Sequence, residues 1–172
     1  ITSNNALFNT LTGTIKNLYV DNYSKTTKNA YGGLIYSASS NATIDNVHMN
    51  KVRIHARERI GGIVGSGSSI TIRNSSVTDF IPMLYTDTNG LALEDKTFEF
   101  DNIYVGSLAG YTYLSFIENS FAQDIDIEVN EVLSTYGVGG LVGRMDNGTL
   151  TNAYATGKIE CNSVNVGGLV GW

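Results

Sequence analysis

The feature that most constrains this chain is an internal repeat built on a glycine-containing hexapeptide. VGGLVG occurs at 138–143 and again at 166–171. Looser copies start at Asn4, Tyr31, Ile60 and Val105, so successive starts are 27, 29, 45, 33 and 28 residues apart. Self-similarity at a period of roughly 20–50 residues is typical of solenoids and other repeat folds. A single repeat of this size cannot bury its own apolar residues, so the repeats are expected to stack.

A second motif follows the hexapeptide at a nearly constant distance. It has the pattern T-I-x-N in its clearest copies, and its asparagine lies 13, 15, 14, 14 and 14 residues after the start of the repeat. These asparagines are Asn17, Asn46, Asn74, Asn119 and Asn152. Two motifs held at one offset in five copies indicate a single structural unit per repeat.

Each repeat consists of short runs of apolar and β-branched residues separated by Gly, Asn and Ser, which predicts strands and turns. No window keeps a helical period over three turns. We therefore predict an all-β fold, a right-handed parallel β-helix of five coils and the start of a sixth. The handedness follows from the general rule for parallel crossovers. Residues 1–172 are predicted to form one domain, a fragment of a larger chain.

Stacking equivalent residues predicts columns that run through the solenoid. One apolar column contains Leu7, Leu34, Ile63, Leu108, Leu141 and Leu169, and a second contains Ile15, Ile44, Ile72, Ile117 and Leu150. We expect the five motif asparagines to form an inward ladder at a bend, with each side-chain amide bonded to the next coil. The residues before them are Lys16, Asp45, Arg73, Glu118 and Thr151. Their alternating charge suits an exposed face of stacked strands.

The VGGLVG hexapeptides with T-I-x-N segments between them resemble the GLUG repeats of bacterial surface proteins. Such repeats occur in the non-catalytic N-terminal region of the zinc metallopeptidases that cleave immunoglobulin A1. The resemblance covers nearly the whole chain, but it fails in an insertion at 80–104, and the first copy lacks its glycines. It implies a secreted or cell-wall-attached parent protein. In that parent this segment would position a host protein, immunoglobulin A1 being the candidate, or contact other domains.

Composition excludes several classes of function. The net charge of −5 disfavours nucleic acid, because phosphate binding needs clustered Lys and Arg. The single cysteine, Cys161, rules out an internal disulfide and a zinc site built from several cysteines. Since no apolar stretch approaches about 18 residues, we expect no membrane insertion.

No pattern of catalytic residues is recognisable. The two histidines, His48 and His55, do not form the H-E-x-x-H pattern of zinc peptidases. Asp45 and Glu118 share a predicted column, but the coil of Arg73 separates them, which disfavours the paired acid and base of a polysaccharide-processing β-helix. We expect no catalytic residue, metal or cofactor in this segment. A stand-alone adhesin that binds host glycan or protein is the main alternative function.

Two groups of residues are candidates for partner contact. The first is the 80–104 insertion with Tyr85, Asp87 and Phe98, because insertions in solenoids commonly form loops on the binding face. The insertion could equally cover a column or dock another domain of the parent. The second group lies two residues after the motif asparagine and is interrupted by a serine. It comprises Tyr19, His48, Phe121 and Tyr154, which form either a stacking platform or packing beneath loops.

Overall fold

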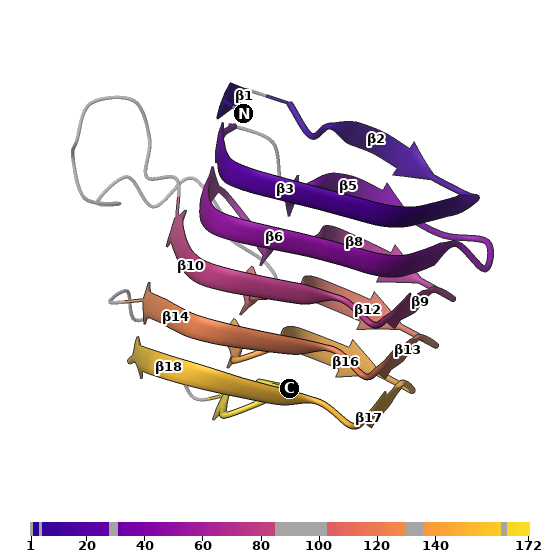
Figure 1. Ribbon diagram of the computed structural model, residues 1–172. Helices are drawn as coiled ribbons and strands as arrows, with labels where there is room; N and C mark the ends of the chain where they lie inside the picture. The colour runs from indigo at the N-terminus through magenta and orange to yellow at the C-terminus, as the bar shows by residue number, and fades with distance from the viewer. Residues whose placement is uncertain (1, 4, 28–30, 85–102, 130–135, 163–164) are drawn as a thin grey trace, which may run out of the picture.

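The computed structural model describes residues 2–3, 5–27, 31–84, 103–129, 136–162 and 165–172, and within these ranges it contains strands and no helix. The strands form three parallel sheets that share one solenoid (Figure 1). Sheet A contains β1 (Thr2–Ser3), β3 (Thr14–Thr26), β6 (Thr43–Ala56), β9 (Thr71–Arg73), β10 (Ser76–Leu84), β13 (Phe116–Glu118), β14 (Phe121–Val129), β17 (Thr149–Thr151) and β18 (Tyr154–Cys161). Sheet B contains β2 (Phe8–Leu11), β5 (Ile35–Ala38), β8 (Val64–Ser68), β12 (Ala109–Tyr113) and β16 (Val142–Asp146). Sheet C contains β4 (Tyr31–Gly32), β7 (Arg59–Gly61), β11 (Ile103–Gly106), β15 (Tyr136–Gly139) and β19 (Val166–Gly167).

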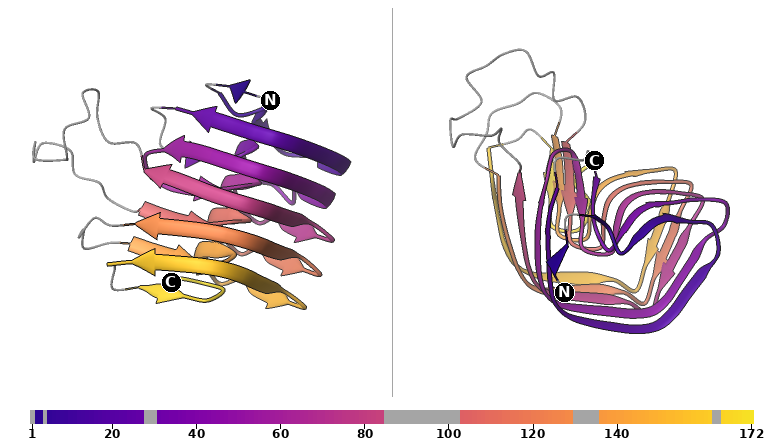
Figure 2. Two further views of the ribbon diagram at one scale, coloured as in Figure 1. Left: turned by 60° about the vertical axis from the view of Figure 1, so that its left-hand side comes forward. Right: turned by 90° about the horizontal axis from the view of Figure 1, so that it is seen from above.

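The chain passes through the sheets in the order C, B, A and then starts the next coil. The second coil is β4 to β6, the third β7 to β10, the fourth β11 to β14 and the fifth β15 to β18. Seen from the N-terminal end, the chain turns clockwise as it recedes (Figures 1 and 2), which confirms the predicted right-handed parallel β-helix.

The number of complete coils is smaller than predicted. Four coils, the second to the fifth, have strands in all three sheets. The first has β2 and β3 but no described strand in sheet C, and β19 begins a further coil. The prediction of five coils counted the first hexapeptide copy as a whole one, although this copy lacks the glycines that the others use to form the corner between sheets C and B.

Glycines shape the corner where the chain passes from sheet C to sheet B, which we call the hexapeptide corner (Figure 2, right). Here the two strands approach each other backbone to backbone. A Cβ on Gly110 would lie 2.7 Å from the carbonyl carbon of Arg59 and from the nitrogen of Ile60. A Cβ on Gly143 would lie 2.4 Å from the nitrogen of Val105. These residues are therefore glycine because backbone atoms of another coil occupy the side-chain space.

The bends of sheet A are made by left-handed residues instead. The five motif asparagines have φ between 48° and 56°, and the backbone bends again five residues later in every coil. The residues at this second bend are Asn22, Lys51, Asp79, Asp124 and Gly157. Asn and Asp adopt the left-handed region more readily than other residues with a side chain. The two bends wrap sheet A around the core, as Figure 2 shows from above.

The predicted apolar columns form the core. Leu34, Ile63, Leu108 and Leu141 are fully buried and hydrogen-bonded coil to coil through their backbones. In the second column Ile44, Ile72 and Ile117 are buried, with half-buried Ile15 and Leu150 at its ends. Leu7 and Leu169, which end the first column, remain 47% and 37% exposed because each has a described coil on one side only.

The predicted inward asparagine ladder is wrong in its direction. Asn17, Asn46, Asn74, Asn119 and Asn152 are all exposed. Two rungs do form on the surface: Asn46 donates to the Asn17 Oδ1 (2.8 Å), and Asn152 donates to the Asn119 Oδ1 (3.1 Å). The reason is the left-handed backbone, which turns these side chains away from the core at the bend.

Serines provide the buried polar ladder instead. The Ser75 Oγ accepts from the backbone N–H of Val47, and the Ser120 Oγ accepts from the N–H of Ser75. Both serines are buried, and each hydroxyl donates to a carbonyl two residues earlier. These bonds satisfy backbone groups that the bend removes from the strand ladder.

Candidate functional site

The predicted charged column exists on the outer face of sheet A. The register aligns Lys16, Asp45, Arg73, Glu118 and Thr151. Arg73 binds Asp45 at 3.0 Å, and Asn74 donates to the same carboxylate at 2.9 Å. The hydrogen bonds from Asn74 and Arg73 lower the pKa of Asp45. A glycosidase acid needs a raised pKa, so Asp45 suits an ion pair better than proton donation to a glycosidic oxygen.

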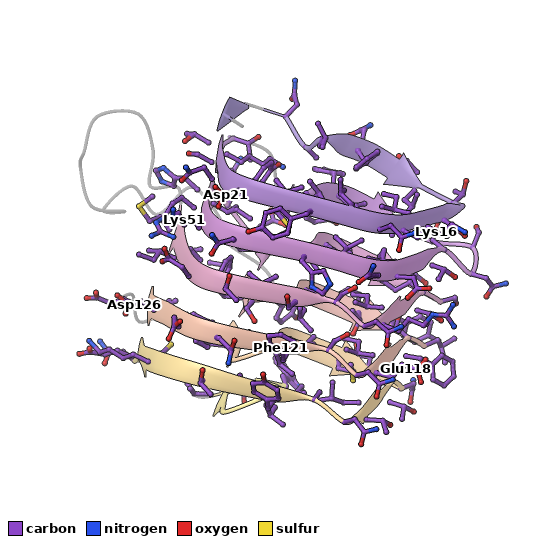
Figure 3. The ribbon with its side chains drawn as sticks, in the orientation of Figure 1. Lys16, Asp21, Lys51, Glu118, Phe121 and Asp126 are labelled. Carbon is purple, nitrogen blue, oxygen red and sulfur yellow. The ribbon has the colours of Figure 1, made fainter. Side chains whose placement is uncertain are left out.

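The predicted aromatic column also exists. Tyr19, His48, Ser76, Phe121 and Tyr154 are consecutive partners across sheet A. Tyr19 and Tyr154 are 67% and 45% exposed, so this column is not buried beneath loops. Figure 3 shows Phe121 on the broad face of the sheet, between Asp126 at one end and Glu118 at the other.

The geometry of this column limits what it can bind. The Phe121 and Tyr154 rings stack with centroids 4.9 Å apart and planes 3° from parallel. The facing surfaces of these two rings therefore contact each other and are not available to a ligand. The His48 ring is held at both nitrogens, at 2.8 Å from the Ser76 Oγ and at 2.8 Å from the Asn46 Oδ1. Three side chains of the column thus contact other side chains of the same surface, and Tyr19 is its most exposed member.

The 80–104 insertion is shorter than predicted. Strand β10 continues to Leu84, with Phe80 and Pro82 paired to Val52 and Ile54 of β6. The next described residue, Ile103, begins β11. Residues 80–84 therefore belong to the solenoid. The candidates Tyr85, Asp87 and Phe98 lie outside the described residues.

A stack of rings and guanidinium groups lines the hexapeptide corner. The Arg59 Cζ lies 4.8 Å from the ring centroid of Tyr31 and 4.7 Å from that of Tyr111. Two coils further on, the Arg144 Cζ lies 4.4 Å from the centroid of the Trp172 ring. Arg144 also donates to the Tyr104 hydroxyl at 2.8 Å. Aromatic and cationic coils thus alternate along the axis, an arrangement favoured by cation–π attraction.

The sequence carries a signal for this stack one residue beyond the hexapeptide. The residue that directly follows the hexapeptide is Ser66, Tyr111, Arg144 or Trp172 in the last four copies. Hexapeptide copies that stack in space place these residues in one line, as the pairing of Ser66, Tyr111 and Arg144 shows.

Lys25 is a buried cation that the sequence analysis also missed. Its side chain occupies a core position opposite Ile54 and is 1% exposed. The Nζ donates to the Tyr31 carbonyl at 3.3 Å and lies 6.0 Å from the Tyr36 ring centroid. Burial lowers its pKa to about 8. The side chain is enclosed, so Lys25 affects stability more directly than ligand contact.

Exposed apolar side chains also gather on the fourth coil. Tyr113, Leu114 and Phe116 lie at the passage from β12 to β13 and are 39%, 46% and 58% exposed. Their signal in the sequence is that Phe116 replaces the first threonine of the T-I-x-N motif. We call these three residues the apolar corner.

Within the described ranges, no group of three or more His, Cys, Asp or Glu side chains is placed to hold a metal ion. The same residues include no helix that could cross a membrane.

Comparison with known proteins supports a GLUG repeat region in this chain. Residues 134–160, which include most of the fifth coil, match the family model of the GLUG motif. The chain is also similar to Halomucin of Haloquadratum walsbyi, with 34% identity over 111 residues. This alignment covers 62% of the chain and 1% of Halomucin, so the chain spans a very small part of the relative it matches. No solved structure matches the chain.

Proposed function

We propose that this chain is a non-catalytic structural and recognition module of a secreted or cell-wall-attached protein. It acts as a rigid extension that spaces or supports other parts of its parent chain and presents side chains on its surface. The observation that supports this most directly is the register of the coils. Each of the three sheets continues from coil to coil, so bending the solenoid requires hydrogen bonds and core contacts to be lost together.

The comparisons support the same proposal. The GLUG motif match indicates a repeat module, and Halomucin is so long that the aligned part is 1% of it. A similar segment can therefore serve as a small unit of a very large protein. The single cysteine is compatible with extracellular use, because the stacked core stabilises the module without disulfides.

A finer proposal concerns the parent. The motif resemblance supports a parent similar to the immunoglobulin A1-specific zinc metallopeptidases, with the H-E-x-x-H motif outside this segment. Immunoglobulin A1 or another domain of the parent would then be the partner, contacted through the insertion with Tyr85, Asp87 and Phe98. The parent gene tests this idea, because it should encode H-E-x-x-H further along. Deletion of residues 85–102 should abolish binding to immunoglobulin A1, and unchanged binding would contradict the assignment.

A stand-alone adhesin is the second candidate. The exposed Tyr19 and the apolar corner favour it, because both offer aromatic surface outside the insertion. An adhesin gene should run to a wall anchor and encode no peptidase motif.

The spacer role can be tested by lengthening the solenoid. Duplication of residues 138–165 adds one coil, which should extend the particle by about 4.8 Å without widening its cross-section. Small-angle X-ray scattering of the two chains measures this difference. As a matched control, 28 Gly and Ser residues inserted at the same point should broaden the distribution of dimensions instead. If the duplicated coil also broadens that distribution, the module is not a rigid spacer.

A further inference from the structure

The apolar corner departs from the pattern of the coils around it. Phe116 pairs with Thr71 in the third coil and with Thr149 in the fifth. The same column continues through Thr43 and Thr14, so threonine occupies this position in every other described coil. A phenylalanine that is 58% exposed thus interrupts a threonine column.

The two other members of the apolar corner also replace polar residues. Tyr113 pairs with Ser68 on one side and with Asp146 on the other. The backbone N–H of Leu114 bonds to the Asp146 carbonyl, which places Leu114 next to Asn147 of the fifth coil. The corner is therefore a small apolar surface among Ser, Thr, Asn and Asp residues of the neighbouring coils.

The backbone of Leu114 shows that this replacement has a cost. Its φ of 48° lies in the left-handed region, which is unfavourable for a bulky apolar residue. The other described non-glycine residues with positive φ are Asn17, Asn22, Ser40, Asn41, Asn46, Lys51, Ser69, Asn74, Asp79, Asn119, Asp124, Asn147 and Asn152. All of these are polar. An exposed leucine in a strained conformation gains little from packing, and such local conflicts are concentrated at functional surfaces.

The size of the apolar corner limits the kind of partner. Large apolar side chains have areas of about 150–250 Å² each, so the exposed fractions leave on the order of 250 Å² accessible. A stable protein–protein interface buries about 800 Å² on each partner. The corner alone is therefore too small for a second copy of the chain and fits a narrow ligand.

The charges around the corner largely offset one another, because Glu118, two residues after Phe116 on β13, lies opposite Arg73 on β9. Ser68 and Ser69 precede it along the axis, and Asn147 and Thr149 follow it. The adjacent carboxylate, Asp146, is bound by Arg144 at 2.9 Å and by the Tyr111 hydroxyl at 3.1 Å. A ligand at this surface meets apolar rings bordered by hydroxyl and amide groups.

We infer that the apolar corner binds a neutral carbohydrate chain. A sugar ring carries C–H groups that pack on apolar and aromatic side chains, and hydroxyl groups that bond to serine, threonine and asparagine. The neighbouring coils repeat such polar groups along the axis, so a chain of sugars can extend beyond the corner. This inference rests on the proposed recognition role and names the surface and the ligand class. The aromatic column is less suitable, because Phe121 and Tyr154 use ring faces on each other.

The experiment compares the whole chain with a variant that restores the residues of neighbouring coils. In Tyr113→Ser, Leu114→Asn and Phe116→Thr combined, each new residue already occupies the equivalent position in another coil, so the solenoid should remain folded. The probes are neutral oligosaccharides of glucose, mannose, galactose and N-acetylglucosamine, with oligomers of galacturonic acid as charged comparators. Binding is measured by calorimetry, and folding by circular dichroism.

We expect the chain to bind a neutral oligosaccharide, and the triple variant to bind it at least about tenfold more weakly with no loss of melting temperature. The control Val166→Thr, which replaces an exposed apolar side chain of sheet C, should bind like the unsubstituted chain. Absence of binding to every neutral probe, or equal binding by the triple variant, would overturn the inference. So would a change from dimer to monomer in the triple variant, because the corner would then be a self-association surface. Any of these results leaves the spacer role intact, since coil duplication tests that role separately.

Discussion

The turn at the hexapeptide corner requires glycine, which has no side chain. The bends of sheet A instead require residues whose side chains are compatible with a left-handed backbone. Gly110 and Gly143 occupy positions where backbone atoms of another strand fill the Cβ space. Asn46 and Asn119 occupy positions where only the local φ is unusual and the side chain is in solvent. The difference shows that a steric constraint from packing and a conformational constraint from a turn select different residues. It also predicts that equally small substitutions will have unequal effects at the two kinds of bend.

The largest effect is expected for Gly110→Ala. Its methyl group would lie 2.7 Å from backbone atoms of Arg59 and Ile60, which cannot move without separating sheets B and C. We expect a loss of about 3 kcal/mol in the free energy of unfolding, measured by denaturant titration. Gly13→Ala is the matched control, because nothing lies within 4 Å of a Cβ there. Equal stability of the two variants would show that the glycines of the corner are not sterically required.

Lys25→Met should act in the opposite direction. A buried lysine has its pKa lowered to about 8, below the ordinary value of 10.5, so the unfolded state binds more protons between these values. The stability of the unsubstituted chain should therefore rise from about pH 8 to pH 10.5 and stay at its lower level below pH 8. Lys25→Met should remove this rise and stabilise the chain by about 2 kcal/mol near neutral pH. Thermal unfolding at pH 7 and pH 10 measures both effects, and a pH dependence unchanged by the substitution would contradict the burial of Lys25.

Arg59→Met tests the stack of rings and guanidinium groups at the hexapeptide corner. It keeps much of the side-chain volume but removes the guanidinium between the Tyr31 and Tyr111 rings. We expect a loss of about 1–2 kcal/mol, since a partly desolvated cation–π contact with each ring disappears. Arg73→Met on the exposed face of sheet A should cost about 0.5 kcal/mol or less, because solvent screens its pair with Asp45. Chemical denaturation of both variants tests the contrast, which fails if Arg73→Met is the more damaging.

The smallest effect is expected for Asn46→Ala. The alanine must adopt a φ of 56° and loses the exposed hydrogen bonds to Asn17 and His48, so stability should fall by about 0.5–1 kcal/mol. Asn46→Gly relieves the backbone strain, and its free energy of unfolding should stay within about 0.5 kcal/mol of that of the unsubstituted chain. Calorimetric melting of both variants measures the difference. An equal loss in both variants would show that the surface hydrogen bonds, and not the backbone conformation, select asparagine here.

Several parts of the candidate site could be predicted from the sequence, because equivalent residues of stacked coils must be neighbours. The alignment of Lys16, Asp45, Arg73 and Glu118 follows from counting residues between motifs, and so does the row from Tyr19 to Tyr154. Counting could not find the stack of Arg59 on Tyr31 and Tyr111. Arg59 pairs with Tyr31 within sheet C one residue away from the register that the hexapeptide starts predict. Tyr111 belongs to sheet B and meets Arg59 because the hexapeptide folds sheet C back against sheet B.

Repetition along the chain specifies the periodic part of this protein: parallel strands, the stacking of its coils and the identity of the leucine and isoleucine columns. These follow from repetition, since a period imposed along the chain becomes a stack in space. The direction of the side chains at the bends depends instead on the folded backbone. The left-handed backbone turns Asn46 and Asn119 outward and leaves the buried polar role to Ser75 and Ser120. The same conformation exposes Leu114 beside Tyr113 and Phe116, because side-chain direction at a bend depends on the backbone dihedral angles that stacking imposes and not on the period.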